Sequence, residues 1–449
     1  MNSKNIDIEK TIELEKSRLQ LENRSQGGMT AYLVSLELLE DDPVEIQESL
    51  QELGALVRTL GDDCIGVTVQ KKARPVPATF IGPGKAEEIK ESCKNLKIDY
   101  IVFDQQLSPT QVRNLEVLIG KPILDRTGII LQIFKKNARS KEAKTQVEIA
   151  NLEYIAPRLS NAWITWERQR GSGGSGGKLR GAGETQIEVD RRKIADKITN
   201  LKKELEKIQK ERETQRKNRS DEWNVVLVGY TNAGKTTLMN SLTESHLSAK
   251  ESLFETLDSS IRRIRGVNNM NILVTDTVGF IRNLPHGLVA SFRSTLDEAA
   301  KADLILHVVD VSHRAHKDHI KVTKDVLAQV GASEVPQIFI FNKIDMLASE
   351  PRLPKILARA YPRSICISSE KEDDIKRCRE MIVEFLAQNM LEKIFHVSYG
   401  DSKTLSLIYA YTRVLESNWG QDNGVFKVRM TKSIYNRYFL EIKSEDIIV

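Results

Sequence analysis

Short apolar runs and amphipathic stretches alternate along the first third of the chain. Apolar runs such as AYLVSLEL, IGVTVQ and YIVFD are separated by stretches with helical spacing at residues 43–60 and 85–96. Strands that alternate with helices in this way are typical of parallel sheets in α/β domains. The pattern predicts an N-terminal α/β domain with a largely parallel sheet over residues 31–144, after a polar tail over residues 1–30.

Two further helical patterns flank a glycine-rich segment. Apolar residues step by three and four over residues 145–159 and again over residues 194–208, which predicts two helices packed together. Between them, seven of the thirteen residues from Gly171 to Gly183 are glycine. So many glycines can neither hold a helix nor bury a core. We therefore expect residues 145–220 to form a helical hairpin with a Gly/Arg-rich loop.

Beyond residue 220, apolar strands again alternate with amphipathic helices. The runs NVVLVG, NILVTD, LILHVVD, QIFIFN and SICIS are each followed by helix-forming sequence, the last from Asp373 to Met390. IRRIRGV is joined to NILVTD through Asn268 and Asn269, and this favours a hairpin that adds one antiparallel edge strand. The pattern predicts a doubly wound, mostly parallel sheet over residues 221–392.

The last segment, residues 393–449, has a different pattern. The strand FHVSY is followed by a predicted helix from Lys403 to Glu416 and by two predicted strands around GVFKVRM and YNRYFLEI. These elements predict a small α+β appendage of β-α-β-β order. The whole chain is thus expected to be of the α/β class, with about two to four domains for its 449 residues.

Composition favours a cytoplasmic protein. No apolar run approaches the ~18 residues of a membrane span, and the polar start MNSKNIDIEK lacks the apolar core of a signal peptide. Four widely spaced cysteines, without a CxxC pair, suggest half-buried thiols rather than a zinc site or disulfides. A net charge of +5 is mild, and nothing in the sequence demands more than a monomer, an integral membrane segment or a DNA partner.

A phosphate-binding loop follows the strand NVVLV. The segment GYTNAGKT has the Gly-x4-Gly-Lys-Thr spacing and opens the helical run TTLMNSL. In such a loop backbone N–H groups face the phosphates, Lys235 neutralises the β and γ oxygens, and the Thr236 hydroxyl binds Mg²⁺. The predicted nucleotide contacts are Gly229, Tyr230, Thr231, Asn232, Ala233, Gly234, Lys235 and Thr236.

A second motif, DTVG, follows the strand NILVT. A carboxylate at the end of this strand can hold Mg²⁺ through water, and the N–H of Gly279 can sense the γ-phosphate. The predicted contacts here are Asp276, Thr277, Val278 and Gly279. Phe280 comes next, where many such hydrolases carry a glutamine that orients the attacking water. We therefore expect hydrolysis to be slow without a partner.

A third motif, NKID, decides the base. Guanine offers N1–H and N2–H donors that a carboxylate accepts in pairs, and adenine lacks both, so Asp345 should select GTP over ATP. Asn342 would brace the pocket, Lys343 would lie over the base, and Ser368 and Ser369 would present N–H groups to guanine O6. The predicted base contacts are Asn342, Lys343, Ile344, Asp345, Ser368, Ser369 and Glu370.

Thr256, in SLFETLDSS, is the predicted second Mg²⁺ hydroxyl, and it would order its loop only when the γ-phosphate is present. Ser252, Ser259 and Ser260 offer competing hydroxyls nearby, and an ordinary polar loop would look the same. The predicted Mg²⁺ ligands are Thr236 and Thr256, and the predicted catalytic residues are Lys235, Thr256 and Gly279.

Weaker patterns allow more than one interpretation. The histidines of VSHRAHKDH, His313, His316 and His319, fit the solvated start of a helix better than a metal site because Arg314 and Lys317 lie beside them. GPGK, at residues 82–85, fits a turn before a helix, and a second phosphate site is the alternative.

The glycine-rich loop lies in a basic region. Residues 134–183 hold ten Lys or Arg and four Glu, a net charge of +6. Cations meet phosphates and the indoles of Trp163 and Trp166 can stack on bases, which favours RNA contact over a charged, solvated linker. The predicted RNA contacts are Arg168, Arg170, Lys178 and Arg180.

Over most of its length, from about Ala31 to the C-terminal appendage, the sequence resembles the HflX family of ribosome-associated GTPases. The matching segments include FIGPGKAEEI, FDQQLSPTQVRNLE, LDRTGIILQIF, RGAGETQIEVDRR, FETLD, DTVGFIRNLP and NKID. The segment from Arg180 to Arg192, just ahead of a P-loop, makes the combination specific. Ala182 departs from it, because proline is usual there.

The resemblance implies a GTPase that binds the large (50S) ribosomal subunit, with the hairpin loop directed toward ribosomal RNA. It implies roles in translation, ribosome biogenesis or the splitting of stalled ribosomes, with GTP/GDP and Mg²⁺ as ligands. It also adds the loop residues Phe254, Glu255, Thr256, Leu257 and Asp258 to the GTP contacts. The alternative is a regulatory GTPase that acts on a protein or membrane-associated partner without binding ribosomes.

Overall fold

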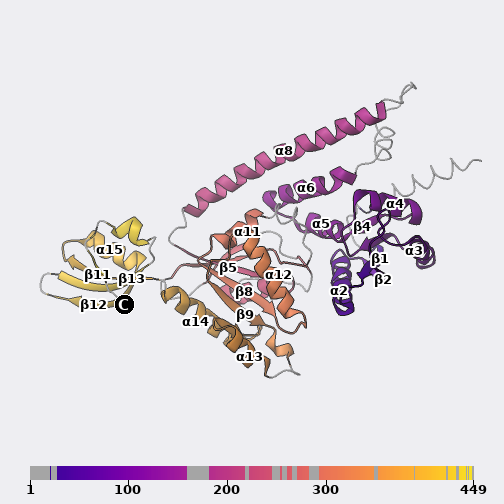
Figure 1. Cartoon of the computed structure of the whole chain (residues 1–449). Coiled ribbons are helices and arrows are strands. Elements are labelled where there is room, and N and C mark those ends of the chain that lie inside the picture. The colour runs from indigo at the N-terminus through magenta and orange to yellow at the C-terminus, as the bar shows by residue number, and fades with distance from the viewer. Residues whose placement is uncertain are drawn as a thin grey trace, which may run out of the picture. The chain divides into compact units, whose positions relative to one another are not determined.

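The computed structural model describes residues 21, 28–158, 182–217, 222–244, 253–254, 260–264, 270–282, 293–347, 352–388, 390–420, 423–430, 434–440, 442 and 444–446. Four parts follow along the chain: an N-terminal α/β domain, a helical hairpin, a domain with a six-stranded sheet and a C-terminal α+β part (Figure 1). Among the helices described, none is long and apolar enough to span a membrane.

The N-terminal domain is built on four parallel strands in the order β2-β1-β3-β4. Strand β1 is buried at seven consecutive positions, as expected for the centre of a parallel sheet covered on both faces. The helices α3 and α4 pack together, and so do α2 and α5. The elements are β1 (Thr30–Leu38), α2 (Pro43–Thr59), β2 (Asp63–Lys72), α3 (Pro83–Leu96), β3 (Tyr100–Phe103), α4 (Pro109–Ile119), β4 (Ile123–Asp125) and α5 (Arg126–Asn137).

Local signals fix where these helices begin. The side chain of Asp42 accepts from Val44 N at the start of α2, and Ser108 and Gln111 form a capping box at the start of α4. GPGK, at residues 82–85, is the first turn of α3: Gly82 N donates to Oε1 of Gln70, and Lys85 pairs with Glu88. The N–H of Gly82 and the ammonium group of Lys85 are thus engaged within the domain.

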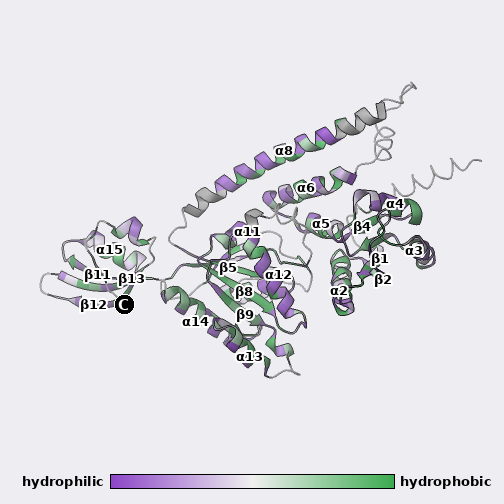
Figure 2. Cartoon of the chain, viewed as in Figure 1, coloured by the Kyte–Doolittle hydropathy of each residue, from purple (hydrophilic) through white to green (hydrophobic). Residues whose placement is uncertain are grey.

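The hairpin consists of α6 (Lys141–Ile155), a short 3₁₀ turn at Ala156–Arg158, and the long helix α8 (Ala182–Lys217). The two helices pack side by side, as predicted, and lysine–glutamate pairs link them: Lys197–Glu148, Lys202–Glu153 and Lys141–Glu204. The helix α6 begins at Lys141, where Ser140 caps it, so it starts earlier than the apolar spacing from residue 145 suggests. In Figure 2 the coloured, central part of α8 is mostly hydrophilic, and most of its described side chains are exposed.

The third part holds six strands in the order β10-β9-β8-β5-β7-β6. All pair in parallel except the edge strand β6, which is antiparallel to β7, and this confirms the predicted antiparallel edge strand. The predicted connection through Asn268 and Asn269 lies outside the described residues. The elements are β5 (Trp223–Gly229), α9 (Lys235–Thr243), β6 (Ser260–Ile264), β7 (Ile272–Asp276), α11 (Arg293–Ala300), β8 (Leu304–Asp310), α12 (His316–Gln329), β9 (Gln337–Asn342), a 3₁₀ turn at Ile344–Met346, α13 (Leu353–Ala360), β10 (Ser364–Cys366) and α14 (Glu372–Gln388).

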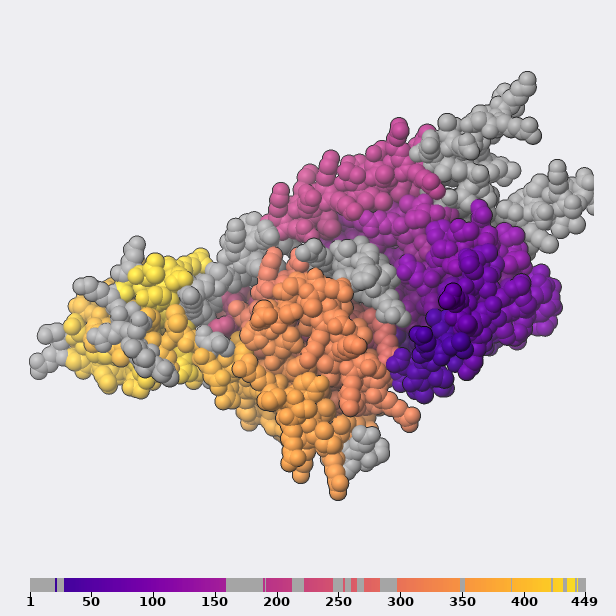
Figure 3. Space-filling model, viewed as in Figure 1, coloured from indigo at the N-terminus to yellow at the C-terminus, as the bar shows by residue number. Residues whose placement is uncertain are grey.

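The core of this domain lies on its central strands. Figure 2 shows the labelled strands β5, β8 and β9 as hydrophobic. In the space-filling view of Figure 3, the face of this domain toward the viewer is made mostly by the orange segment of the chain. Strand β8 is buried at its first six positions. Cys378 is fully buried, and so is Cys93 in the N-terminal domain, so the expectation of half-buried thiols is right only for Cys64 and Cys366.

The C-terminal part is a four-stranded sheet in the order β12-β13-β11-β14 with the helix α15. The predicted order β-α-β-β is wrong in two places. The helix stops at Tyr411 rather than Glu416, and YNRYFLEI forms a π-helical turn at Tyr435–Phe439 rather than a strand, because spacings of three and four let its aromatic rings face the core. The strands are β11 (Leu391–Ser398), β12 (Arg413–Trp419), β13 (Asn423–Met430) and β14 (Ser444–Asp446), and α15 is Ser402–Tyr411.

Candidate nucleotide site

The glycine-rich loop joins β5 to α9 at the carboxyl edge of the six-stranded sheet. Gly234 has a φ of +90°, and a Cβ there would lie 2.3 Å from Nδ2 of Asn342. Only glycine fits such a position. The loop therefore has the conformation in which successive backbone N–H groups and the start of a helix can surround a phosphate.

Lys235, the first residue of α9, is buried. Its Nζ atom lies 3.1 Å from the carbonyl oxygen of Gly229 and 3.0 Å from that of Tyr230. Burial lowers the pKa of Lys235 to about 8, while Asp276 acts to raise it. A buried ammonium held mainly by neutral carbonyl oxygens would gain strongly from a phosphate, because an anion stabilises its charged form.

Thr236 and Asp276 meet beside this lysine. Thr236 Oγ1 donates to Oδ2 of Asp276 at 2.7 Å, and Asp276 is fully buried at the end of β7. A hydroxyl and a carboxylate are the oxygen ligands that Mg²⁺ prefers. The donor set therefore fits the expected cation, with phosphate oxygens and water completing its coordination.

The DTVG segment runs directly along the phosphate loop. Thr231 N donates to the carbonyl of Phe280 at 2.7 Å, and Phe280 N donates to that of Gly229 at 3.1 Å. A Cβ on Gly279 would lie 2.8 Å from Cα of Thr231, so this close approach requires glycine. The ring of Phe280 is buried, which places no water-orienting side chain at this position.

Asn342 ties the phosphate loop to the base loop. Its Nδ2 donates to Ala233 O at 2.9 Å, and its Oδ1 accepts from the N–H and the hydroxyl of Ser369 at 3.0 and 2.7 Å. Lys343 forms an ion pair with Asp310 at 2.7 Å. Asp345 lies on the 3₁₀ turn Ile344–Met346, directly after Ile344, and it is exposed. The carboxylate of Asp345 is therefore accessible to a ligand.

The expectation for Ser368 and Ser369 needs correction. Ser368 N donates to Oδ2 of Asp374 at 2.8 Å, and Ser369 N donates to Asn342. Both N–H groups are thus used within the protein rather than presented to a base. The N–H of Glu370, an exposed residue, is the next along this loop, and its position is the better candidate for guanine O6.

Sequence comparisons match this arrangement. Residues 224–343 match the family described as "50S ribosome-binding GTPase", residues 137–219 the "GTP-binding GTPase Middle Region" and residues 47–135 the "GTP-binding GTPase N-terminal". The protein named "GTPase HflX" of Escherichia coli is 37% identical over 415 residues, which cover 92% of this chain and 95% of that protein. This chain belongs to the HflX family.

Two other similar proteins are a second relative and a solved structure. The GTPase HflX of Gluconacetobacter diazotrophicus is 36% identical over 445 residues, covering 91% of this chain and 96% of that protein. A GTP-binding protein from Sulfolobus solfataricus, solved in complex with GDP, is 26% identical and covers 80% of this chain and 99% of that chain, with a TM-score of 0.44. As a member of the HflX GTPases, the chain is a GTP hydrolase of the P-loop class, and its α/β fold agrees with the prediction.

The expectation of a solvated helix start holds for His313, which is exposed, but not for His319. The helix α12 does begin at His316, but the ring of His319 is buried and stacks on Tyr230 of the phosphate loop, with centroids 3.7 Å apart. Burial, with His313 and Arg282 nearby, lowers the pKa of His319 to about 3, so the ring is neutral. Its role is packing, and the described residues hold no cluster of three potential metal ligands.

Several predicted contacts lie outside the described residues. They are Glu255, Thr256, Leu257 and Asp258 of the loop, and Arg168, Arg170, Lys178 and Arg180 of the hairpin. Phe254 is described, and it is not placed as a nucleotide contact: its ring is buried against Phe134 of α5.

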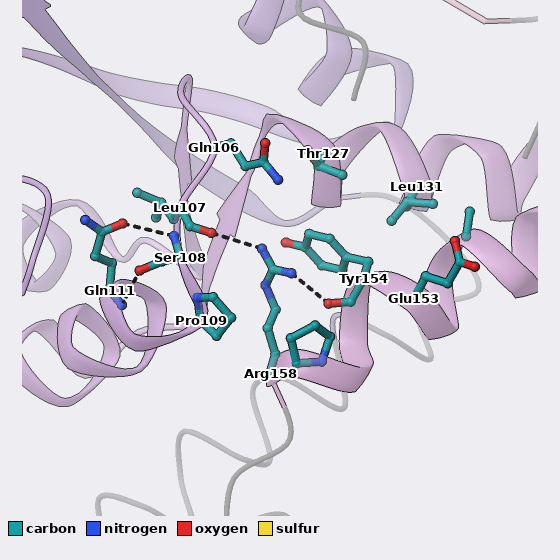
Figure 4. Close-up of a pocket in the computed structure, with 12 residues that line it drawn as sticks. Gln106, Leu107, Ser108, Pro109, Gln111, Thr127, Leu131, Glu153, Tyr154 and Arg158 are labelled. Atoms are coloured by element: carbon teal, nitrogen blue, oxygen red, sulfur yellow. Dashed lines mark hydrogen bonds between the residues drawn. The ribbon is translucent and has the colours of Figure 1, made fainter. Parts of the chain in front are cut away.

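A cavity of about 580 Å³ in the N-terminal domain had no signal in the sequence. It lies beyond the carboxyl ends of β3 and β4, where Figure 4 shows Arg158 reaching from the end of α6 toward Leu107. Arg158 covers the ring of Tyr154 at 3.6 Å and donates to the carbonyl oxygens of Leu107 and Tyr154. Because Arg158 is already engaged in these contacts, the cavity would select a ligand by its shape more than by its charge.

Proposed function

We propose that this GTPase binds the large ribosomal subunit in its GTP form, and that it acts in translation, ribosome biogenesis or the splitting of stalled ribosomes. The observation that carries this proposal is the match of residues 224–343 to the family described as "50S ribosome-binding GTPase". The basic region at residues 134–183, with a net charge of +6, supports RNA as the surface contacted. A cytoplasmic location would follow from a ribosomal partner.

Each predicted residue has a distinct role in GTP binding. Lys235 would neutralise the β and γ oxygens, Asp345 would accept from guanine N1–H and N2–H, and Gly279 N–H would bond to the γ-phosphate. Mg²⁺, held by the hydroxyls of Thr236 and Thr256 with Asp276 behind it, would neutralise charge that develops on the transferred phosphoryl group. Contact of Thr256 and Gly279 with the γ-phosphate would distinguish GTP from GDP.

The position after Gly279 explains why a partner is expected to accelerate turnover. Phe280 is buried and carries no group that could orient the attacking water. The missing group would come from the ribosome or from a loop ordered by it. We expect purified large subunits to raise the hydrolysis rate, whereas a rate that no ribosomal component changes would argue against a site completed by the partner.

Sedimentation with purified ribosomal subunits tests the proposal. We expect co-migration with the large subunit in a non-hydrolysable GTP analogue and little in GDP. Replacing the four hairpin cations with alanine should abolish co-migration while GTP affinity is kept; these are Arg168, Arg170, Lys178 and Arg180. Four exposed cations of α8 serve as the control for net charge, namely Arg191, Arg192, Lys203 and Lys207.

The outcomes separate the two functions that the sequence allows. If binding depends on the analogue and on the hairpin cations alone, the ribosome is the partner. If the protein binds GTP but stays with neither subunit in either nucleotide, the function is that of a regulatory GTPase with a protein or membrane-associated partner.

A further inference from the structure

Tyr230, the second residue of the phosphate loop, turns its side chain toward the segment that follows Gly279. Its Oη atom accepts a hydrogen bond from the backbone N–H of Arg282 at 2.7 Å. Tyr230 is only 5% exposed, so this bond is shielded from water. Arg282 lies three positions after Gly279. The bond therefore fixes the backbone close to the N–H group that is expected to contact the γ-phosphate.

The hydroxyl of Tyr230 takes the place of a backbone acceptor. Around Phe280 the phosphate loop and the DTVG segment pair as parallel strands do. In a parallel ladder the next N–H along this segment, that of Arg282, would donate to the carbonyl oxygen of Thr231. The phosphate loop turns away at this point, because Ala233 N bonds back to the carbonyl oxygen of Tyr230 at 3.3 Å. The side chain of Tyr230 thus continues the pairing past the turn.

The start of α12 holds both partners of this bond. The ring of His319 stacks on that of Tyr230, with the two planes 9° apart, and His313 packs against His319 in turn, with ring centroids 4.7 Å apart. Asp318, directly before His319, forms an ion pair with the side chain of Arg282 at 2.9 Å. A ring covered on its face can rotate little, so the direction of the Tyr230 hydroxyl is fixed.

Packing alone does not require a hydroxyl at this position. A phenylalanine would fill the same space and could stack on His319 in the same way. A buried hydroxyl also costs free energy unless it is hydrogen-bonded. What tyrosine adds to residue 230 is therefore the bond to Arg282 N.

We propose that Tyr230 is a positioning residue for GTP hydrolysis: stacked on His319, it holds the backbone beyond Gly279, and so holds the Gly279 N–H where the γ-phosphate binds. The proposal rests on the proposed role of Gly279 in GTP binding. A donor that is in place before the nucleotide arrives needs no reorganisation as charge develops on the phosphate. GDP has no γ-phosphate, so its binding does not depend on this bond.

Tyr230→Phe in the full-length chain is the first test, because it removes one oxygen atom and keeps the ring. Single-turnover GTP hydrolysis should slow about three- to tenfold, the usual range for one hydrogen bond. The affinity for a non-hydrolysable GTP analogue should fall by a similar factor, while the affinity for GDP is kept. An unchanged hydrolysis rate would overturn the proposal. So would equal losses of affinity for the analogue and for GDP, because the hydroxyl would then support the phosphate loop as a whole.

His319→Leu tests the stack that holds the tyrosine. It should slow hydrolysis like Tyr230→Phe, with the affinity for GDP kept. The double variant should be little worse than Tyr230→Phe alone, because His319 acts on the reaction only through the hydroxyl that is then absent. Effects that multiply in the double variant would mean that the two residues act independently, and the proposal would fail.

Two matched controls come from the same domain. His307→Leu removes another buried imidazole that stacks on an aromatic ring, that of Phe339, with centroids 4.8 Å apart. Tyr361→Phe removes another tyrosine hydroxyl, at the end of α13. Neither should change the ratio of the affinities for the GTP analogue and for GDP, whatever it does to thermal unfolding. A loss in either control equal to that in Tyr230→Phe would mean that domain stability, not the bond to Arg282, sets the ratio.

Gly279→Ala separates this proposal from the role on which it rests, because its Cβ would lie 2.8 Å from Cα of Thr231 and displace the N–H. If Gly279→Ala slows hydrolysis and Tyr230→Phe does not, the role of Gly279 stands and the positioning role of Tyr230 is refuted. If Gly279→Ala hydrolyses GTP at the wild-type rate, the role of Gly279 itself fails, and the positioning role fails with it.

Discussion

In the N-terminal domain, the carboxyl end of the parallel sheet carries a buried arginine, whereas in the GTPase domain it carries a buried lysine. Arg126 is 2% exposed and bonds to Asp104, Glu52 and Ser49. Lys235 is 6% exposed, and carbonyl oxygens of the phosphate loop surround its Nζ. The two sheets thus share a fold class but differ in how the buried cation is compensated.

The two pKa values show what this difference means. Burial works against the charge of Arg126, but the carboxylates of Asp104 and Glu52 outweigh it and raise the pKa. Burial also works against the charge of Lys235, and there Asp276 does not compensate for it. A cation with its own carboxylates serves the fold, and a cation without close ones is poised for an external anion. The comparison locates the nucleotide site in the second sheet without reference to any motif.

The largest expected effect comes from breaking the compensated network. Arg126→Met leaves the buried carboxylate of Asp104 and the partly buried carboxylate of Glu52 without their cation, which typically costs about 3–5 kcal/mol of folding stability. We expect thermal unfolding of the N-terminal domain at a clearly lower temperature, while the GTP affinity of the folded protein is unchanged. Lys94→Met, which breaks an exposed pair with Glu91, is the control and should shift the transition little. A similar shift in both variants would contradict the assignment of Arg126 to the fold.

Removing the uncompensated cation should have the opposite profile. Lys235→Ala should lower GTP hydrolysis by about 10²–10³-fold, the usual scale for losing one group that stabilises developing charge. The melting temperature of the protein without nucleotide should not fall, because burying the charge of Lys235 costs folding free energy and the substitution removes that charge. Single-turnover hydrolysis and thermal unfolding, measured on the same preparation, test both halves. Loss of stability together with activity would mean that Lys235 supports the fold.

The sequence predicts contacts that depend on local spacing, and it fails for contacts that depend on partners elsewhere in the protein. The phosphate loop, the DTVG segment and Asn342 lie where strand–turn–helix patterns predict them, because each depends on local spacing. The predictions for Ser368, Ser369 and His319 failed because other residues of the protein engage these groups. Asp374 and Asn342 accept the N–H groups that the pattern assigned to the ligand, and Tyr230 stacks on the ring that the pattern assigned to solvent.

Phe254 is the clearest case of this limit. Its partner Asn137 lies 117 positions away in the chain, and a bond across that separation leaves no periodic signal. Local spacing also misled the prediction for Tyr435–Phe439, where strand-forming residues adopt a π-helical turn because their rings are buried together. Long-range packing therefore accounts for what the sequence could not show.

Base selection gives a smaller expected effect than loss of the lysine. Asp345 is exposed, and its carboxylate would accept from both guanine donors, so Asp345→Asn should lower GTP affinity about 100-fold. A xanthine nucleotide carries an oxygen at position 2 in place of the amino group, and it should bind the variant better than GTP does. Titration with fluorescent nucleotides of both bases decides this. Unchanged preference for guanine would remove Asp345 from the base pocket.

The smallest expected effect is a dependence of nucleotide affinity on pH, which follows from the pKa of about 8 for Lys235. In the unfolded chain the value is 10.5, so the folded protein binds this proton less tightly and its stability should rise as pH increases from about 8 to 10.5. Bound phosphates would restore the charged form. Nucleotide binding would then take up a proton above pH 8, and the affinity for GDP should fall up to about tenfold per pH unit there.

A variant without the lysine shows whether this pH dependence comes from Lys235. Below pH 8 the lysine is charged with or without nucleotide, so affinity should be level from about pH 6.5 to 7.5. Lys235→Ala should bind GDP weakly but with no slope above pH 8, which isolates the lysine from any titration of guanine or phosphate. The same slope in wild type and variant would assign the proton elsewhere, and it would leave the contrast between Lys235 and Arg126 resting on geometry alone.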